Sequence, residues 1–530
     1  MRLFCCNLQA PFSKYSPKRF WVFKSCNMKN ALLVCFLLGS TVLAAQPALP
    51  EFQISKAEVE AHLRFLASDA LMGRRTGAAG NNIAAQYLAS HLEAYGFKNV
   101  PGATKYFQSI PFEAVKPPAS AKLTLGKSSF EQGEELMILT GEAASLSTTA
   151  VFAGNGWVDA ETGHDDYKGL DVAGKIVLVL PGPPDSKDPL AVFQAMGTKR
   201  KLAAERGAVA LIELYRLSFP WGFFRSYFNK ENLRTPSNEP ESAAAKKMVY
   251  GWWKEPSQEL VRSLQGKKAK ATLTSSGFSS RAMPSQNVIG VLEGSDPVLK
   301  NEYVLMTAHY DHMGVGKDGG SPYTAKDSIF NGTRDNAMGT VALIAAAKAF
   351  SLDRPKRSIL FLAVTGEELG LLGSQYYAEN PLIPHNQVIF NLNIDNAGYN
   401  NTDYISIIGH GRTGTDDLLQ KGVEALGLKV FPNPAPEQNL FDRSDNVSFA
   451  AKGIPALTFS LGITEFDEAI GKYYHQAIDN PETIDYDYFL KYCQSFIYTT
   501  RLIADDAGKP RWVKGDKYEK AGKLLYGLGE

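Results

Sequence analysis

The sequence predicts an α/β protein with a mixed, mostly parallel sheet sandwiched by helices and an inserted β-rich module. Three observations predict this fold class: strands and helices alternate from Ser285 onward, short β-like runs with glycine-rich turns fill about 135–280, and residues 52–100 show helical spacing. The 530 residues allow two or three domains. A composition of 44% apolar and 21% charged residues is typical of a soluble globular protein.

The N-terminal part is expected to form two helices around a turn. Apolar residues recur at helical spacing in 52–100, and the turn covers 72–80. In the β-rich module, residues 172–182 (VAGKIVLVLPG) predict a buried strand that runs into a turn. Residues 199–214 (KRKLAAERGAVALIEL) predict a helix, a glycine and a strand. The aromatic segment 221–253 matches no pattern.

The C-terminal half predicts a sheet covered by helices on both faces. Strands are expected at 288–292, 303–308, 358–364, 388–394, 404–408 and 456–460. Helices are expected at 337–350, 371–380 and 416–426. The polar tail after residue 505 is expected to wrap over the surface.

Residues 1–45 are predicted to be a secretory signal region. They carry six Lys or Arg and no acidic residue, so the rest of the chain sums to 1 − 6 = −5. The apolar stretch 31–45 ends in small residues, which places cleavage near Ala44 or Ala45. An uncleaved membrane anchor is the alternative, and Met28 is an alternative start. We therefore expect an exported protein, periplasmic or extracellular, without stable membrane insertion.

The positions of the cysteines argue against an internal disulfide, and the distribution of charge argues against nucleic-acid binding. Four of the five cysteines, Cys5, Cys6, Cys26 and Cys35, lie in the signal region. Only Cys493 would remain after cleavage, so no internal disulfide is expected. The body of the chain has no prominent basic patch, which gives nucleic-acid binding little support.

Residues suited to metal binding or proton transfer follow several apolar runs. They are His309 (TAHYDHMG), Asp335 (NGTRDNAMG), Glu367 and Glu368 (VTGEELG), Asp395 (NLNIDNAG) and His475 (YYHQAIDNPETID). Ligands of an open α/β sheet bind beyond the carboxyl ends of its strands, and four of these six residues come directly after predicted strands. The fold is therefore expected to gather them at one edge of the sheet.

Each residue taken alone also has an ordinary structural explanation. A His-x-Asp pair is commonly a satisfied contact, Asp335 could be a helix N-cap, and adjacent glutamates are commonly solvated. Asp395 is different, because an unpaired carboxylate after a buried strand is costly. Together the residues favour a metal site, since two histidines and three carboxylates suffice for two zinc ions if one carboxylate bridges them. Cobalt or manganese would also suit such ligands.

The adjacent glutamates can divide the chemistry between them. Glu368 would coordinate metal, while Glu367 would take a proton from the attacking water. Asp311 can accept the second ring proton of His309 and fix its orientation.

These motifs resemble those of the secreted co-catalytic zinc aminopeptidases of clan MH, and the resemblance covers most of 55–500. The run LASDALMGRRTGAAGNNIAAQYL is similar to the N-terminal helix and Gly-Arg loop of that family. The runs GLDVAGKIVLVLPG and AAERGAVALIEL resemble a protease-associated domain. The implied organisation is a signal region (1–45), the first part of the peptidase domain (46–134), a protease-associated insert (135–280), the zinc peptidase domain with its zinc exopeptidase fold (281–505) and a tail (506–530).

The resemblance also implies a role for each position. One zinc ion would be held by His309 and Asp395, the other by Glu368 and His475, with Asp335 bridging them. Glu367 would be the general base that activates water and then protonates the leaving amine, and Asp311 would be the partner of His309. A cis peptide bond is implied between Asp335 and Asn336.

The chain departs from the family pattern at two places. Thr333-Arg334 stands where the family often has Ala-Asp, and the run 443–446 (RSDN) ends in asparagine where histidine is commoner. Arg334 is expected to form an ordinary surface ion pair, the alternative being that it binds a substrate carboxylate. Three other histidines, His312, His385 and His410, have no comparable support.

An aminopeptidase acting on peptides is the function that this resemblance implies. A carboxypeptidase or dipeptidase on the same scaffold is the nearest alternative, because the sequence does not show whether an amine or a carboxylate faces the metals. A receptor-like protein with an inactive peptidase domain is disfavoured, because no ligand position is lost. The oligomeric state stays open.

Overall fold

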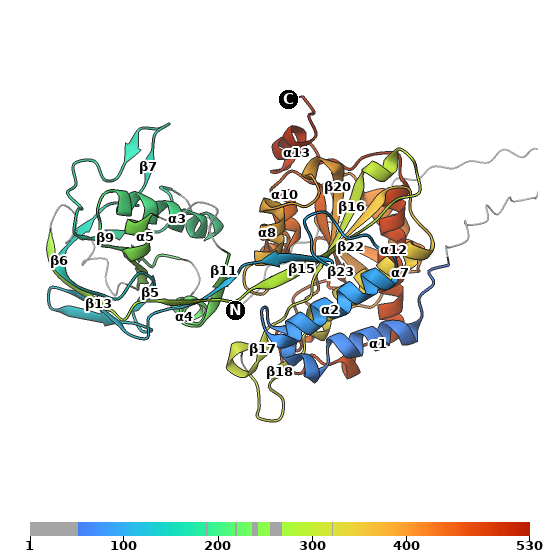
Figure 1. Cartoon of the computed structure of the whole chain (residues 1–530), viewed down its shortest axis with the longest axis horizontal. Coiled ribbons are helices and arrows are strands. Elements are labelled where there is room, and N and C mark those ends of the chain that lie inside the picture. Colours follow the sequence, from blue (N-terminus) through green and yellow to red (C-terminus); the bar gives the residue numbers. More distant parts are fainter. Residues whose placement is uncertain are drawn as a thin grey trace, which may run out of the picture. The chain divides into compact units, whose positions relative to one another are not determined.

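A mixed sheet of eight strands forms the centre of the C-terminal half (Figure 1). The computed structural model describes residues 51–185, 189–217, 220–235, 242–254, 268–320 and 322–529, so the predicted signal region lies outside the described residues. The strands run in the order β1 (Phe107–Ile110), β15 (Ser285–Leu292), β19 (Ser358–Val364), β16 (Tyr303–His309), β20 (Val388–Ile394), β23 (Ala456–Leu461), β21 (Tyr404–Ile408) and β22 (Lys429–Pro432).

The middle of this sheet is parallel and its flanks are mixed. β19, β16, β20 and β23 run parallel to one another, whereas β15 and β21 pair antiparallel with this central set. Parallel strands end at a common edge, so the residues that follow β16, β19 and β20 emerge together.

Both faces of the sheet are buried, and the alternation along β19 shows how. Ile359, Phe361 and Ala363 belong to the core on one face, while Leu360, Leu362 and Val364 belong to the core on the other. The first core also takes side chains from α1 (Lys56–Leu66), α2 (Ala79–Ala94), α7 (Gly339–Leu352), α9 (Asp416–Glu424) and α12 (Tyr486–Asp505). The second takes them from α8 (Leu372–Glu379) and α10 (Asn446–Ala450).

Local signals explain where several of these helices begin and how they pack. The side chain of Ser55 accepts a hydrogen bond from the backbone N–H of Glu58 and caps α1. Asp485 caps α12 in the same way. Eleven of the 14 residues of α7 are buried, which agrees with its alanine-rich sequence, in which Lys348 is the one charged residue.

The β-rich module has a sheet of its own. Its strands run in the order β4 (Ser128–Glu131), β3 (Ala121–Leu125), β13 (Ala269–Ser275), β6 (Ala144–Phe152), β9 (Ile176–Val179), β10 (Ala210–Leu214), β12 (Val249–Trp253) and β5 (Leu136–Thr140). Among the described residues of the module, the helices are α3 (Pro189–Glu205), α4 (Trp221–Phe228) and α5 (Ala243–Lys247). Smaller sheets pair β11 (Asn232–Arg234), β2 (Glu113–Lys116) and β14 (Ser279–Ala282), then β17 (Gly314–Val315) with β18 (Ile329–Phe330), and β7 (Val158–Asp159) with β8 (His164–Asp165).

The predicted elements of the C-terminal half agree with those in the structure to within three residues, the largest difference being the start of β15 at Ser285. The β-rich sheet, however, takes strands from residue 121 onward, because β3 and β4 pair with β13 and with each other. The segment without an assigned pattern holds α4, β11, α5 and β12. The tail is anchored more firmly than a polar wrap suggests, since Trp512 is buried and α13 (Glu519–Leu525) follows it. Within the described residues, we find no helix with the length and apolar character needed to cross a membrane.

Candidate metal centre

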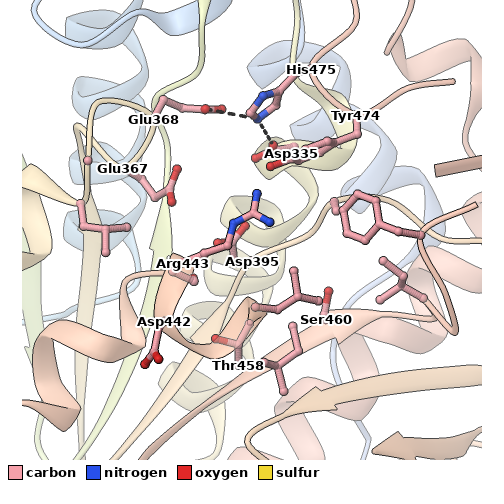
Figure 2. Close-up of a pocket in the computed structure, with 18 of the residues that line it drawn as sticks. Asp335, Glu367, Glu368, Asp395, Asp442, Arg443, Thr458, Ser460, Tyr474 and His475 are labelled. Carbon is pink, nitrogen blue, oxygen red and sulfur yellow. Dashed lines mark ion pairs between the residues drawn. The ribbon is translucent and has the colours of Figure 1, made fainter. Parts of the chain in front are cut away.

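The six predicted site residues meet at the carboxyl edge of the central strands, and Figure 2 shows five of them, Asp335, Glu367, Glu368, Asp395 and His475. His309 ends β16, Glu367 and Glu368 lie in the turn after β19, Asp395 directly follows β20, Asp335 lies in the segment before α7, and His475 lies after α11 (Glu468–Gly471). Five of them line a cavity of about 430 Å³, and His309 is fully buried. Topology therefore brings together residues that are up to 166 positions apart, from 309 to 475.

The first cluster is centred on the imidazole of His309. Its Nε2 lies 3.2 Å from Oδ1 of Asp335 and 3.4 Å from Oδ1 of Asp395. Its Nδ1 lies 3.3 Å from the backbone oxygen of Asp311, which can only accept a hydrogen bond. Nδ1 therefore carries a ring hydrogen, which would leave the Nε2 lone pair free for a metal ion held with the two carboxylates.

The second cluster is centred on His475. Its Nε2 lies 3.1 Å from Oδ2 of Asp335 and 3.3 Å from Oε2 of Glu368, and Figure 2 shows both pairs as dashed lines. The two oxygens of Asp335 thus face different imidazoles. Asp335 is shared between the clusters, as expected for a bridging carboxylate.

The spacing of these atoms suits metal ions better than direct ion pairs. A tetrahedral ion with bonds of about 2.0–2.1 Å holds its ligand atoms roughly 3.3–3.4 Å apart. The four separations are 3.2, 3.4, 3.1 and 3.3 Å. Charge-assisted hydrogen bonds are shorter, at about 2.7–2.9 Å. The donor set, imidazole with carboxylate, also suits zinc.

The fold neighbours and the sequence relatives agree with this geometry. Residues 287–500 match the model of peptidase family M28. These residues resemble peptidase family M28 and are called the M28 domain below. The chain is 26% identical over 333 residues to "Aminopeptidase YwaD" of Bacillus subtilis (strain 168), which is 62% of each protein. It is 26% identical over 357 residues to "Aminopeptidase Y" of Saccharomyces cerevisiae, covering 62% of this chain and 59% of that one. The chain therefore spans about three fifths of the length of these curated relatives.

A solved structure shows the same fold. The aminopeptidase from Aneurinibacillus sp. strain AM-1 superposes with a TM-score of 0.56 and 20% sequence identity, over 86% of this chain and 95% of that one. The sheet of the M28 domain, with helices on both faces, is thus the fold that the sequence predicts. The cis peptide bond implied between Asp335 and Asn336 is also present.

The carboxylates control the charge of the imidazoles in the M28 domain. Burial alone would lower the pKa of His475, but Glu368 and Asp335 raise it to about 9. Burial opposes protonation of His309 too, yet Glu367, Asp335 and Asp395 raise its pKa well above the ordinary value. In the absence of metal, both imidazoles are therefore protonated at the nitrogen that faces the carboxylates.

Glu367 differs electrostatically from its neighbour. Burial, followed by the charges of Asp395 and Glu368, raises the pKa of Glu367 well above its usual range. Although burial also opposes ionisation of Glu368, the charge of His475 leaves its pKa lowered. The two glutamates are thus separated into a group that holds a proton readily and a group that stays ionised.

The carboxylate of Asp311 forms its hydrogen bonds with groups other than His309, its predicted partner. Its Oδ1 lies 3.7 Å from Nδ1 of His309. It instead accepts hydrogen bonds from the Thr76 hydroxyl at 2.9 Å and from the backbone N–H of Glu367 at 3.3 Å. Asp311 therefore connects the N-terminal Gly-Arg loop to the turn that carries Glu367.

Arg334 is not a surface residue, so that expectation was wrong. It is 4% exposed, and its Nη1 lies 2.6 Å from Oδ1 of Asp479. The guanidinium also donates to Thr483 and lies 3.7 Å from the ring centroid of Tyr473. These contacts occupy its donors inside the protein and join the segment that carries Asp335 to the loop after His475.

His312 is a site neighbour that the sequence analysis left out. Its Nδ1 lies 2.6 Å from Oε1 of Glu368, and it forms a candidate metal-binding group with Asp335 and Glu368. A separation of 2.6 Å is short for two ligand atoms of one tetrahedral ion. His312 and Glu368 therefore make a direct contact with each other. The run HYDH, which places it three residues after His309, was the available signal.

Two other cavity residues, Arg443 and Tyr474, and the buried Asp445 were given no role in the predicted site. Arg443 and Tyr474 line the cavity, and Figure 2 shows the Arg443 guanidinium pointing into it between Glu367 and Asp335. Asp445 is fully buried, and among the described residues neither of its carboxylate oxygens has a hydrogen-bond partner. Burial raises the pKa of Asp445 to about 7.

Proposed function

We propose that this protein is a zinc-dependent aminopeptidase that binds two zinc ions and removes N-terminal residues from peptides. The observation that carries the proposal is the pair of clusters that share Asp335, with ligand atoms 3.1–3.4 Å apart. One ion would be held by His309 and Asp395, and the other by Glu368 and His475, with Asp335 between them.

The charge of the site supports two divalent ions. Asp335, Glu367, Glu368 and Asp395 line the same cavity and carry −4 when ionised, while two neutral imidazoles add nothing. Two divalent cations supply +4, so the sum is zero. Without them, buried like charges would repel one another and force protonation.

The remaining residues of the site would handle the proton and the substrate. Bound zinc supplies Lewis acidity, which polarises the scissile carbonyl and acidifies the attacking water. Glu367, whose raised pKa makes it a good proton acceptor, would take the proton of the water and deliver it to the leaving amine. Asp311 would position Glu367 by accepting a hydrogen bond from the backbone N–H of Glu367.

The cavity also suits an apolar side chain at the peptide N-terminus. Its lining includes Ile408, Leu440, Ile463 and Phe466 beside the acidic cluster. The acidic cluster would meet the free amine, and the apolar wall would hold the side chain of the first residue.

A dipeptidase is a second candidate, and Arg443 is the observation that favours it. Its exposed guanidinium points into the cavity and makes a long contact of 3.5 Å with Gln438. A guanidinium at this position could pair with the carboxylate of a short substrate. We also infer that 135–280 is a protease-associated domain and that 1–45 directs export, on the sequence patterns described above.

Hydrolysis of a substrate panel tests the proposal. Leucinamide, free peptides and N-acetylated peptides would be compared with and without a chelator, in the wild type and in Glu367→Gln. We expect chelator-sensitive release from free N-termini, reduced by roughly 10²–10⁴-fold in Glu367→Gln. The control is Glu161→Gln, an exposed glutamate of the inserted module, which should leave the rate unchanged.

The outcomes separate the candidates. Zinc content of Glu367→Gln should stay near two per chain, because Glu367 is not assigned as a ligand. Cleavage of dipeptides only would favour the dipeptidase, and cleavage of N-acetylated peptides would point to a carboxypeptidase. A zinc-loaded protein that hydrolyses none of these substrates would refute the enzyme proposal.

A further inference from the structure

Helix α4 of the inserted module has aromatic side chains on two faces. Trp221 and Phe224 are buried, and Phe224 packs with ring centroids 5.2 Å from Trp252 and 4.5 Å from Phe228. The indole N–H of Trp221 donates to the backbone oxygen of Glu134 at 2.5 Å. This face is enough to hold the helix on the module.

The other face leaves two aromatic residues exposed. Phe223 is 72% exposed and Tyr227 is 42% exposed, and their i, i+4 spacing places them side by side on the helix. Tyr227 contacts Phe228 with ring centroids 4.9 Å apart, but a large part of its side chain stays open to solvent. Adjacent exposed aromatic groups are typical of binding surfaces.

This exposed face borders the candidate metal centre. Tyr227 lines the same cavity as Glu367 and Glu368. Its hydroxyl oxygen lies 3.8 Å from where a Cβ atom on Gly370 would be. The backbone N–H of Gly370 donates to the carbonyl of Glu367 at 2.9 Å, so Tyr227 sits against the turn that presents Glu367.

The position of Tyr227 beside Glu367 identifies the part of a substrate that it would contact. If Glu367 protonates the leaving amine, the residue that owns this amine lies next to Glu367. That residue is the one after the scissile bond. Tyr227 is therefore on the leaving-group side of the cavity, whereas the apolar wall that includes Ile463 and Phe466 is available to the first residue.

We propose that Tyr227, with Phe223 next to it on the exposed face of α4, forms the subsite for the second residue of the peptide and favours an aromatic residue there. This inference rests on the proposed aminopeptidase function. Stacking of a substrate ring on Tyr227 would contribute through aromatic contact and burial. The inserted module would then determine specificity at a site whose chemistry belongs to the M28 domain.

Two peptides that differ only at the second residue test this subsite. Leu-Phe-Gly and Leu-Gly-Gly would be compared by kcat/KM in the wild type, Tyr227→Ala, Tyr227→Phe and Phe223→Ala. We expect the wild type to prefer Leu-Phe-Gly and Tyr227→Ala to lose this preference by about 3–10-fold, while Tyr227→Phe retains it because the ring remains. Tyr323→Ala is the matched control, since Tyr323 is 44% exposed and does not line the cavity.

A binding measurement keeps the subsite separate from catalysis. Calorimetric titration of zinc-loaded Glu367→Gln with Phe-Gly and Gly-Gly, the two leaving products, should show tighter binding of Phe-Gly that Tyr227→Ala removes. Equal losses on both peptides, or an unchanged preference, would overturn the subsite. Failure of the wild type to hydrolyse leucinamide would instead refute the aminopeptidase function, because leucinamide has no second residue.

Discussion

Two buried clusters of charged side chains in this protein are neutralised in different ways. In the inserted module, Lys199 and Glu213 are both fully buried, with Nζ 2.5 Å from Oε2. Glu213 also accepts a hydrogen bond from the Tyr250 hydroxyl, and Lys199 donates to the carbonyl of Leu180. Whichever of the two residues holds the proton, the net charge of the pair is zero.

The M28 site lacks such an internal balance. Five carboxylates line its cavity, those of Asp335, Glu367, Glu368, Asp395 and Asp442, together with Arg443 and His475. The imidazole–carboxylate separations of 3.1–3.4 Å around His309 and His475 are longer than the 2.5 Å of the Lys199 pair. Burying unpaired charge is costly, so this cluster needs cations from solution. On the proposed function, the first cluster is completed by folding, and the second takes up metal cations or, in their absence, protons.

Asp335→Asn should have the largest effect, because it removes charge from the residue that both clusters share. We expect zinc content to fall below one per chain. The value of kcat/KM should drop by at least about a thousandfold, which is more than the removal of one hydrogen-bond donor from an active site usually causes. Metal analysis and peptide hydrolysis measure the two effects. The control is Asp403→Asn, an exposed aspartate. Full zinc occupancy in Asp335→Asn would contradict the shared-ligand arrangement.

Glu213→Gln, in the inserted module, should lower stability without lowering zinc content, unlike Asp335→Asn. It leaves Lys199 buried without its partner charge, so the free energy of unfolding should fall by about 3–5 kcal/mol. Urea denaturation measures the loss, and zinc content should not change. In a second variant, Lys199→Met combined with Glu213→Gln, most of this stability should return because no unpaired charge remains. A loss of zinc in Glu213→Gln would show that the two clusters are coupled.

His62 sharpens the comparison with a smaller, pH-dependent effect. Carboxylates raise the pKa of His475, whereas burial, and then the charge of His91, lower the pKa of His62 to about 4. A histidine with a lowered folded-state pKa stabilises the fold above its unfolded pKa of about 6.5 and loses this contribution as the pH falls toward 4. Between pH 7 and pH 4, wild type should therefore lose about 2–3 kcal/mol more stability than His62→Gln.

Urea titrations of both proteins at several pH values measure this difference. Parallel stability curves for wild type and His62→Gln would contradict the assignment. Glu482→Gln, an exposed change, controls for general effects of altered surface charge.

Much of the fold was predictable because its signals are local. The apolar runs at β19, β20 and β21 are bounded by residues that end strands, and their predicted limits match the structure. The proximity of the candidate site residues was predictable for a related reason, since each of them follows a strand or loop that the α/β topology directs to one edge. Residue type and order along the chain were sufficient for this inference.

Residues whose importance depends on distant neighbours were not predictable in the same way. Nothing near Arg334 indicates that Asp479, 145 residues later, will bury it in an ion pair. Tyr227 lies in a segment that matched no pattern, and its place beside Glu367 depends on how the inserted module packs. His312 was left out of the predicted site because its contact with Glu368 joins two segments that come together only in the folded protein.

The sequence by itself determined the α/β class, the succession of strands in the C-terminal half and the six residues of the candidate site, because hydrophobic periodicity and residue chemistry are local properties. Only the tertiary structure decided that Asp335 directs one oxygen to each imidazole, that Arg334 is buried, and that Tyr227 borders the cavity. These features depend on side-chain directions and on contacts between segments far apart in the chain. Packing of the whole molecule sets both.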